Sequence, residues 1–388
     1  MIRWPDGLEA ESFLRRYWQK VPLLLPGGID ETAALPSPEE LAGLACEPEV
    51  ESRIVSGDGK SGWKVRHGPF REHEFLDLPE TGWTLLVQDV EKHVPSLARL
   101  LDRFDFVPRW RLDDLMISYA APGGSVGPHV DAYDVFLIQA PGSRVWELDP
   151  RPADISLRED SDLAVLRSFV PATRYRLEPG DMLYLPPGVA HFGYSTEPSM
   201  TCSVGFRSPS ASELLAAAGR MCEETANPRY VDADLTSSES RDGRIPDAAV
   251  ERLRQLLASA TAAAETNLDE LLGRLVTEGK PWLLPEPAAE SMDTEEILRG
   301  LHNGASLARH PGSRFAWSTR GADCRLFVDG QMWELPGSAA PFCRRLSDGG
   351  PLDGARLGPV DHRTGDVLRA LLACGSLLWD DKSGDIET

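Results

Sequence analysis

The sequence predicts an α+β protein: a double-stranded β-helix (a jelly roll), then a helical region, then a mixed segment with a β-hairpin. Short strand-like runs separated by Gly and Pro turn signals fill Asp114 to Arg207, a pattern typical of a double-sheet jelly roll. The strand pattern stops at Pro209, where Ala- and Leu-rich stretches with helical periodicity begin. Further on, Asp329-Gly330 separates two apolar runs, which is a strong hairpin signal.

The N-terminal part is predicted to alternate short helices and strands. Residues 7–25 indicate a short helix followed by a strand. A helix is expected over Ser37 to Leu44, because Ser37 followed by two glutamates is a typical helix start. Residues 50–90 favour strands and loops. A further helix is expected after them, with one apolar face formed by Val94, Leu97, Leu100 and Leu101.

The central segment contains six candidate strands. Their boundaries are set by Gly and Pro turn signals such as Gly123-Gly124 and Pro187-Gly188. We expect a first domain over residues 1–208 with its core at 110–208. The strands are Leu115 to Ala120, Val130 to Gln139, Arg144 to Leu148, Tyr175 to Leu177, Asp181 to Leu185 and Thr201 to Phe206.

Two further regions follow, over residues 209–279 and 280–388. The first is predicted to contain helices over Ser210 to Met221 and Asp247 to Gly279, with a polar loop between them. The second mixes helices and strands. Its expected elements are helices at Thr294 to Asn303 and Thr364 to Leu372 and strands at Phe315 to Ser318 and within Leu326 to Leu335.

The charge balance of the chain bears on its partners. The 388 residues carry 40 basic and 61 acidic side chains, a formal charge of -21. Such a surface repels nucleic-acid phosphates and favours a basic protein partner. Acidity that only keeps the protein soluble is the alternative explanation. We expect no direct binding of nucleic acid.

The cysteines and the apolar runs bear on the compartment. Six scattered cysteines form no CxxC pair, so neither a zinc ribbon nor a thioredoxin-type motif is present, and the thiols fit a reducing compartment. The N-terminal residues lack the apolar run of a secretory signal. No stretch reaches the roughly 20 apolar residues of a membrane span. A cytoplasmic protein without membrane contact is therefore expected.

Two histidines and one aspartate form the most informative motif. His129 and Asp131 are two residues apart, so on a strand both side chains leave the same face. His191 lies just past the strand-like run that ends at Leu185. Two imidazoles and a carboxylate make up the facial triad that binds Fe(II) and leaves positions open for a co-substrate and O₂.

The alternative is that these are structural or surface histidines, as most single histidines on strands are. The strongly apolar run Val135 to Ile138 follows the first pair after three residues. It places the polar residues at the mouth of a buried strand, which is a usual place for a ligand site.

These segments resemble a known family. The stretch Gly123 to Phe136 is similar to the HxD strand of the JmjC-type cupin oxygenases, and Pro179 to His191 is similar to their distal histidine segment. More narrowly, the chain resembles the bacterial ribosomal oxygenases, which hydroxylate an arginine of a large-subunit ribosomal protein, the sixteenth of its series. The resemblance is strong for residues 110–235 and architectural beyond them. Supporting segments are Tyr17 to Leu25, Ser203 to Arg207 and Arg229 to Leu235.

The resemblance implies a role for each region. Residues 1–208 would be the JmjC/cupin catalytic domain, 209–279 a helical dimerisation region that forms a homodimer, and 280–388 a winged-helix-like domain. Winged helices often bind nucleic acid. However, residues 275–388 carry twelve Lys or Arg against seventeen Asp or Glu, which is the wrong sign for binding phosphates. A protein-facing or structural role is expected for this domain.

The resemblance also implies the cofactors Fe(II), 2-oxoglutarate and O₂, with His129, Asp131 and His191 as catalytic metal ligands. The distal carboxylate of 2-oxoglutarate needs a cation when buried. Arg144, which opens the strand after the HxD strand, matches the basic residue of these oxygenases. An exposed arginine at a strand end is the alternative. The hydroxyl groups expected to assist it belong to Ser203 and Ser118.

The substrate is expected to be a basic ribosomal protein. Tyr133 and Asp134 closely follow Asp131 and would contact its cationic side chain, unless they are only a solvated loop pair. The expected activity is that of an Fe(II)/2-oxoglutarate-dependent dioxygenase, a protein arginine 3-hydroxylase. One alternative is an oxygenase of the same class acting on histidine or methyl-lysine of another protein. Another is a non-catalytic, metal-binding winged-helix scaffold.

Overall fold

The chain divides into two compact units, Met1–Ser208 and Pro209–Thr388. The computed structural model describes residues 2–5, 7–29, 35–58, 62–225, 227–233, 243–288, 292–350, 352–358 and 360–380. The last two residues of the Arg229 to Leu235 segment lie outside these ranges.

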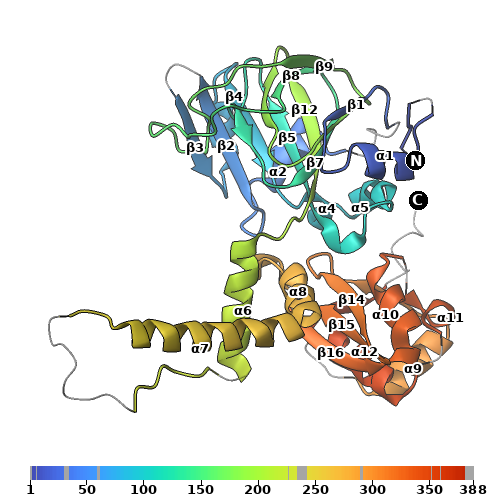
Figure 1. Cartoon of the computed structure of the whole chain (residues 1–388). Helices are drawn as coiled ribbons and strands as arrows, with labels where there is room; N and C mark the ends of the chain where they lie inside the picture. The colour runs from blue at the N-terminus through green and yellow to red at the C-terminus, as the bar shows by residue number, and fades with distance from the viewer. Residues whose placement is uncertain are drawn as a thin grey trace. The chain divides into compact units, whose positions relative to one another are not determined.

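The first unit is the predicted jelly roll, built from two antiparallel sheets (Figure 1). The larger sheet has the strand order β1-β10-β7-β12-β5-β4-β2-β3, and the smaller has the order β6-β11-β8-β9. The strands are β1 (Leu23–Leu25), β2 (Ser52–Asp58), β3 (Gly62–His67), β4 (Trp83–Val87), β5 (Leu112–Ala120), β6 (His129–Val130), β7 (Asp134–Gln139), β8 (Arg144–Asp149), β9 (Thr173–Leu177), β10 (Met182–Leu185), β11 (Ala190–Ser195) and β12 (Ser199–Phe206).

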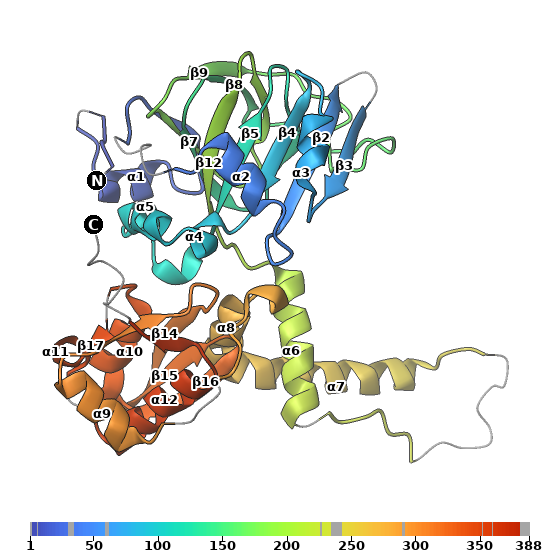
Figure 2. The same ribbon diagram turned by 180° about the vertical axis from the view of Figure 1, so that it is seen from behind.

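Alternation along the strands produces two cores, one on each face of the larger sheet. On β7, Phe136 and Ile138 belong to the outer core, whereas Val135 and Leu137 belong to an inner core shared with Trp146 of β8. The outer core is covered by helices, and α2 and α3 lie across the sheet in Figure 2. The helices of this unit are α1 (Ala10–Arg16), α2 (Pro38–Leu44), α3 (Glu72–Leu76), α4 (Val90–His93) and α5 (Ala98–Leu101).

The helix predicted around Ser37 is present, whereas the next one is broken. Ser37 Oγ accepts a hydrogen bond from the Glu40 amide, and the Glu40 carboxylate accepts one from the Ser37 amide, which completes a capping box for α2. The predicted helix through Val94 to Leu101 divides into α4, a 3-10 turn at Pro95–Leu97, and α5. Pro95 is the reason, because proline has no amide to donate and clashes with the preceding turn.

Two strand predictions around the motif residues were wrong. The single strand expected over Val130 to Gln139 is interrupted, since β6 belongs to the smaller sheet and β7 to the larger one. Asp131 lies in the crossing between them and not on a strand. His191, expected just past a strand, lies within β11, where Gly193 interrupts the apolar pattern that would have revealed the strand.

The second unit begins with three helices, α6 (Ala211–Thr225), α7 (Asp247–Thr266) and α8 (Leu268–Thr277). The helical stretch predicted over Asp247 to Gly279 thus consists of two helices that meet at Asn267. No residue of α7 is buried, and the helix projects from the rest of its unit (Figure 1). Among the described residues, no helix is long and apolar enough to cross a membrane.

The remainder of this unit packs around a separate core. The predicted Asp329-Gly330 hairpin joins β15 (Asp323–Val328) and β16 (Gln331–Pro336), and both turn residues have positive φ (50° and 79°), as a two-residue hairpin of type I′ requires. Helix α8 packs on this sheet through Val276, which clusters with Ala316 and Phe327. The elements are α9 (Thr294–His302), β13 (Ser306–Arg309), β14 (Phe315–Arg320), β15 (Asp323–Val328), β16 (Gln331–Pro336), α10 (Ala340–Ser347), β17 (Leu352–Asp353), α11 (Gly354–Leu357), α12 (His362–Ala373) and β18 (Leu377–Trp379).

Candidate active site

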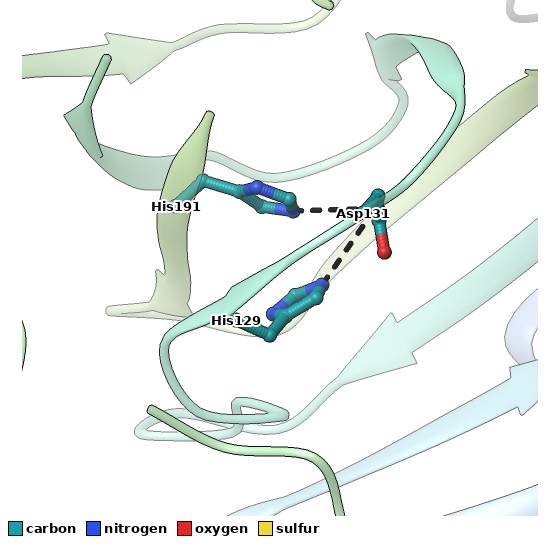
Figure 3. Close-up of side chains that lie close together, drawn as sticks. All are labelled: His129, Asp131 and His191. Atoms are coloured by element: carbon teal, nitrogen blue, oxygen red, sulfur yellow. Dashed lines mark ion pairs between the residues drawn. The ribbon is translucent and has the colours of Figure 1, made fainter. Parts of the chain in front are cut away.

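The three motif residues meet at one end of the smaller sheet. Asp131 Oδ2 lies 3.9 Å from His129 Nε2 and 3.6 Å from His191 Nε2, and the carboxylate faces both rings (Figure 3). Register brings the two histidines together, because His129 of β6 pairs directly with His191 of β11. One potential ligand atom from each residue lies within 4.8 Å of the others. No other group of three such side chains is found in the part of the chain that the structure describes.

Hydrogen bonds to backbone carbonyls orient both imidazoles. His129 Nδ1 lies 3.0 Å from the Gly127 carbonyl, and His191 Nδ1 lies 3.0 Å from the Val189 carbonyl. Since a carbonyl can only accept, each Nδ1 carries the proton and each Nε2 presents a lone pair to the centre. Burial, and then the neighbouring His129, lower the pKa of His191, which keeps this ring neutral. The donor set, two imidazoles and a carboxylate, therefore suits a divalent metal.

A buried cation lies deeper in the barrel. Arg144 is only 4% exposed, and its Nη1 donates hydrogen bonds to Ser118 Oγ (3.2 Å) and Thr201 Oγ1 (3.3 Å). Burial lowers the pKa of Arg144 to about 10, so the side chain stays charged at neutral pH. No carboxylate pairs with it within the described ranges. A buried charge without a counterion is costly, which indicates a site for an anion.

Trp146 lies between this cation and the histidines. The Arg144 guanidinium lies 5.4 Å from the centre of the Trp146 ring, and that ring lies 6.0 Å from the His191 ring. Gly193 makes room for it, because a Cβ there would lie 2.6 Å from the indole. Arg144 Nε and Trp146 Nε1 are buried without an acceptor among the described residues. These donors fit a carboxylate-bearing molecule that extends from the triad towards Arg144.

The two serines expected to help bind the co-substrate are placed differently relative to Arg144. Ser118 accepts a hydrogen bond from Arg144, whereas Ser203 has no hydrogen bond to Arg144 in the described chain. Thr201 takes that place. Both Thr201 and Ser203 face the interior by strand phase, but register pairs Thr201 with Ser118 directly across β12 and β5. The sequence of a single strand does not show which residue of the neighbouring strand lies opposite it, so Thr201 could not be identified from the sequence of β12 alone.

Tyr133 and Asp134 are placed differently from each other. Tyr133 is 43% exposed and stays available to a substrate. Asp134 is fully buried on the far side of β7, where Tyr184, Gln19 and Arg111 donate to its carboxylate. The prediction that Asp134 contacts substrate was therefore wrong. Adjacent side chains of an extended chain point to opposite faces, so Tyr133 and the next residue, Asp134, face opposite sides at the start of β7.

Carboxylates lie near Tyr133, including one that the sequence did not single out. Burial first, then the charges of Asp131 and Asp114, raise the pKa of the Tyr133 hydroxyl, while the charge of Arg53 opposes the shift. Asp114 lies at the start of β5, where a Cβ on Gly205 would lie 3.1 Å from its carboxylate. No local motif distinguishes Asp114 in the sequence, since only the pairing of β5 with β12 brings it to the site.

Comparison with protein families assigns both units. The JmjC domain matches residues 99–214, and the ROXA-like winged helix matches residues 253–377. The AraC-like ligand binding domain also matches, over residues 169–276. The first match contains all three metal-ligand candidates and Arg144.

Known proteins resemble the chain over most of its length. It is 38% identical to the ribosomal protein uL16 3-hydroxylase of Escherichia coli, over 81% of this chain and 82% of that enzyme. It is 32% identical to a probable ribosomal oxygenase of Haemophilus influenzae, over 93% and 91% of the two chains. The structure of the Escherichia coli ribosomal oxygenase YcfD in complex with cobalt and 2-oxoglutarate matches with a TM-score of 0.79 and 32% identity, covering 96% of this chain and 99% of that one.

Proposed function

The chain belongs to the JmjC-type ribosomal oxygenases, and we propose that it is an Fe(II)- and 2-oxoglutarate-dependent hydroxylase of ribosomal protein uL16 that acts on an arginine side chain. The observation that carries the proposal is the buried Arg144, which lies beyond the triad and pairs with no carboxylate within the described ranges. A metal-binding scaffold has no need for such a cation. A co-substrate with a distal carboxylate has that need.

The chain's own residues account for the binding of the cofactors. His129, Asp131 and His191 would hold Fe(II) through their Nε2 and Oδ2 atoms. Arg144, Ser118 and Thr201 would bind the distal carboxylate of 2-oxoglutarate, with the Trp146 ring alongside. When bound, Fe(II) with 2-oxoglutarate and O₂ supplies the oxidation that inserts one oxygen atom into a C–H bond. The protein contributes orientation and excludes water from a largely apolar interior.

The surroundings of Tyr133 support a cationic substrate side chain. Its partly exposed ring offers a face for a guanidinium, and the nearby carboxylates of Asp131 and Asp114 favour positive charge. The formal charge of -21 favours a basic protein over nucleic acid. Tyr133→Ala should therefore raise the KM for a substrate peptide and leave the KM for 2-oxoglutarate unchanged.

Mass spectrometry tests the substrate directly. uL16 from cells that contain this protein should carry one more oxygen atom than uL16 from cells that lack it, and fragmentation should place that atom on an arginine. The purified protein should add the same oxygen to uL16 only with Fe(II) and 2-oxoglutarate, and the Asp131→Ala variant should add none. A uL16 of unchanged mass in both experiments would contradict the proposal.

The alternatives predict other outcomes of the same experiment. An oxygenase that acts on histidine would place the oxygen on histidine, and one that acts on methyl-lysine would remove methyl groups. A non-catalytic scaffold would bind the metal and leave every ribosomal protein unmodified. The relative named as a uL16 3-hydroxylase favours the first proposal over these.

We further propose a cytoplasmic homodimer formed through residues 209–279, with residues 280–388 as a separate domain that does not bind nucleic acid. Helix α7 supports the dimer, because none of its residues is buried although Leu253 and Leu257 are apolar. A double substitution of these leucines by Glu should halve the mass in solution measured by light scattering. An unchanged mass would contradict this interface.

A further inference from the structure

The segment between β8 and β9, residues 150–172, connects the two sheets beside the metal ligands; we call it the strap. Strand β3 is the outer strand of the larger sheet, and β6 is the outer strand of the smaller one. The strap forms hydrogen bonds with β3 and with the residue that precedes β6. The Asp162 amide donates to the Trp63 carbonyl (3.3 Å), and the Leu166 amide donates to the Pro128 carbonyl (2.8 Å). The strap therefore closes the barrel next to His129.

Two buried side chains enclose Gly127 at this place. A Cβ on Gly127 would lie 2.9 Å from Val165 Cγ2 of the strap and 3.1 Å from Trp63 Cε2 of β3. Val165 and Trp63 are almost completely buried. Gly127 also has a φ of +80°, and its amide donates to Ser125 Oγ (3.0 Å). The backbone at Gly127 is thus held from both sides.

Gly127 in turn orients a metal ligand. Its carbonyl accepts the hydrogen bond from His129 Nδ1 at 3.0 Å, and this bond sets the direction of Nε2. The strand that carries His129 contributes little restraint, because β6 has only two residues and pairs with β11 at two positions. The packing around Gly127 therefore adds to the restraint on this ring.

We propose that Val165, acting with Trp63, is a positioning residue of the metal centre. It holds the Gly127 carbonyl where it fixes the His129 ring, although Val165 lies 36 positions away from this ligand in the sequence. The inference rests on the proposed function only in taking the triad as a metal site. It requires no particular substrate.

Titration with Co(II), followed by the absorption of the bound ion, tests the proposal without 2-oxoglutarate or substrate. Val165→Ala removes the contact with Gly127 and leaves its carbonyl less well held, so Co(II) should bind more weakly, by up to the roughly 10-fold that accompanies loss of an outer-shell partner of a ligand. The matched control is Val170→Ala, since this strap residue is 73% exposed and should leave the affinity unchanged. Equal Co(II) affinity of folded Val165→Ala and the wild type would overturn the proposal.

A second variant separates positioning from general stability. Val165→Thr keeps the branched shape against Gly127 but buries a hydroxyl, so it lowers the melting temperature. Under the proposal, Val165→Thr binds Co(II) with an affinity within about 2-fold of the wild type, well short of the roughly 10-fold loss that accompanies removal of an outer-shell partner. If Val165→Thr loses as much Co(II) affinity as Val165→Ala, Val165 has a structural role only.

Gly127→Ala changes the other residue of the contact between Val165 and Gly127. It tests the proposal even if Val165→Ala does not fold. A methyl group there would meet Val165 and displace the carbonyl, so Co(II) affinity should fall. In the double variant the loss should be smaller than the product of the two single losses, since Val165→Ala makes room. Unchanged Co(II) affinity in Gly127→Ala would overturn the proposal. These titrations stand even if uL16 proves not to be the substrate.

Discussion

Arg144 Nη1 donates a hydrogen bond to Ser118 Oγ over 3.2 Å, although the two residues lie 26 positions apart and on different sheets. Thr201, on a third strand, accepts from the same nitrogen. A charged group thus bridges the two sheets of the barrel with hydroxyl partners alone in the described chain. This arrangement prepares a site for an anion, and it makes Arg144 the first residue to test.

Replacing Arg144 by Met should weaken 2-oxoglutarate binding about 10- to 100-fold, because a hydrogen bond to a charged group contributes roughly 1.5–3 kcal/mol. The free energy of unfolding without ligand should not fall, since a buried unpaired cation is replaced by an apolar chain. Calorimetric titration of the metal-loaded protein with 2-oxoglutarate measures the effect. Arg174→Met, at an exposed position on β9, is the control. Unchanged affinity in the Arg144 variant would argue against this co-substrate site.

The hydroxyl partners of Arg144 can be distinguished by two conservative variants. Thr201→Val removes the hydroxyl that contacts Arg144 and keeps the shape of the side chain, so the KM for 2-oxoglutarate should rise about 5-fold, corresponding to roughly 1 kcal/mol for one hydrogen bond. Ser203→Ala should leave this KM unchanged. The reverse order of effects would restore Ser203 as the partner.

Loss of one ligand should abolish stabilisation by metal. A bound ion at 100 times its Kd raises the free energy of unfolding by about 2.7 kcal/mol, so Co(II) should raise the melting temperature of the wild-type protein. His191→Ala should show no such rise, and a chelator should reverse the rise in the wild type. His302→Ala, which changes an exposed histidine of α9, should respond like the wild type. A rise in His191→Ala would mean that Co(II) binds elsewhere.

Glu91 should make stability depend on pH. Its carboxyl group is buried beside Asp89 and Lys92, and burial first, then Asp89, raise its pKa from 4.5 to about 7, while Lys92 opposes the shift. Below pH 4.5 Glu91 is protonated in both the folded and the unfolded state. Between pH 4.5 and 7 the unfolded chain ionises first, so the free energy of unfolding falls as the pH rises.

Glu91→Gln removes this titration and keeps an acceptor for the Leu115 amide. The variant should therefore gain stability relative to the wild type between pH 5 and pH 8, on the order of 1–3 kcal/mol. Urea denaturation at the two pH values measures the change. Glu11→Gln, at an exposed position, should show no pH-dependent difference. A constant difference between Glu91→Gln and the wild type would refute the assignment.

The hydrogen bonds to Asp134 should affect the stability of the fold more than the affinity for metal. The Tyr184 hydroxyl donates a hydrogen bond to Asp134 Oδ1 (2.6 Å) and accepts one from the backbone amide of Gln19 (2.7 Å). Tyr184→Phe leaves both groups without this partner, so the free energy of unfolding should fall by about 2–4 kcal/mol. Co(II) affinity should stay within 2-fold of the wild type. A large loss of affinity with unchanged stability would return Asp134 to the active site.

Much of the fold follows from local patterns. The alternation of short strands and turns predicts the jelly roll, Ser37 and Glu40 predict the start of α2, and Asp329-Gly330 predicts the hairpin. These elements can be predicted because their signals lie in neighbouring residues. The break between β6 and β7 has no such local signal, because the chain there changes from one sheet to the other.

The spacing of His129, Asp131 and His191 in the sequence predicts the donor set, and the family resemblance adds the cation Arg144. The placement of Thr201 beside Arg144, of Asp134 away from the site and of Val165 against Gly127 is visible only in the folded chain. The physical reason is strand register and sheet pairing. A shift of one residue reverses every side chain, and contacts across two sheets leave no trace in local sequence.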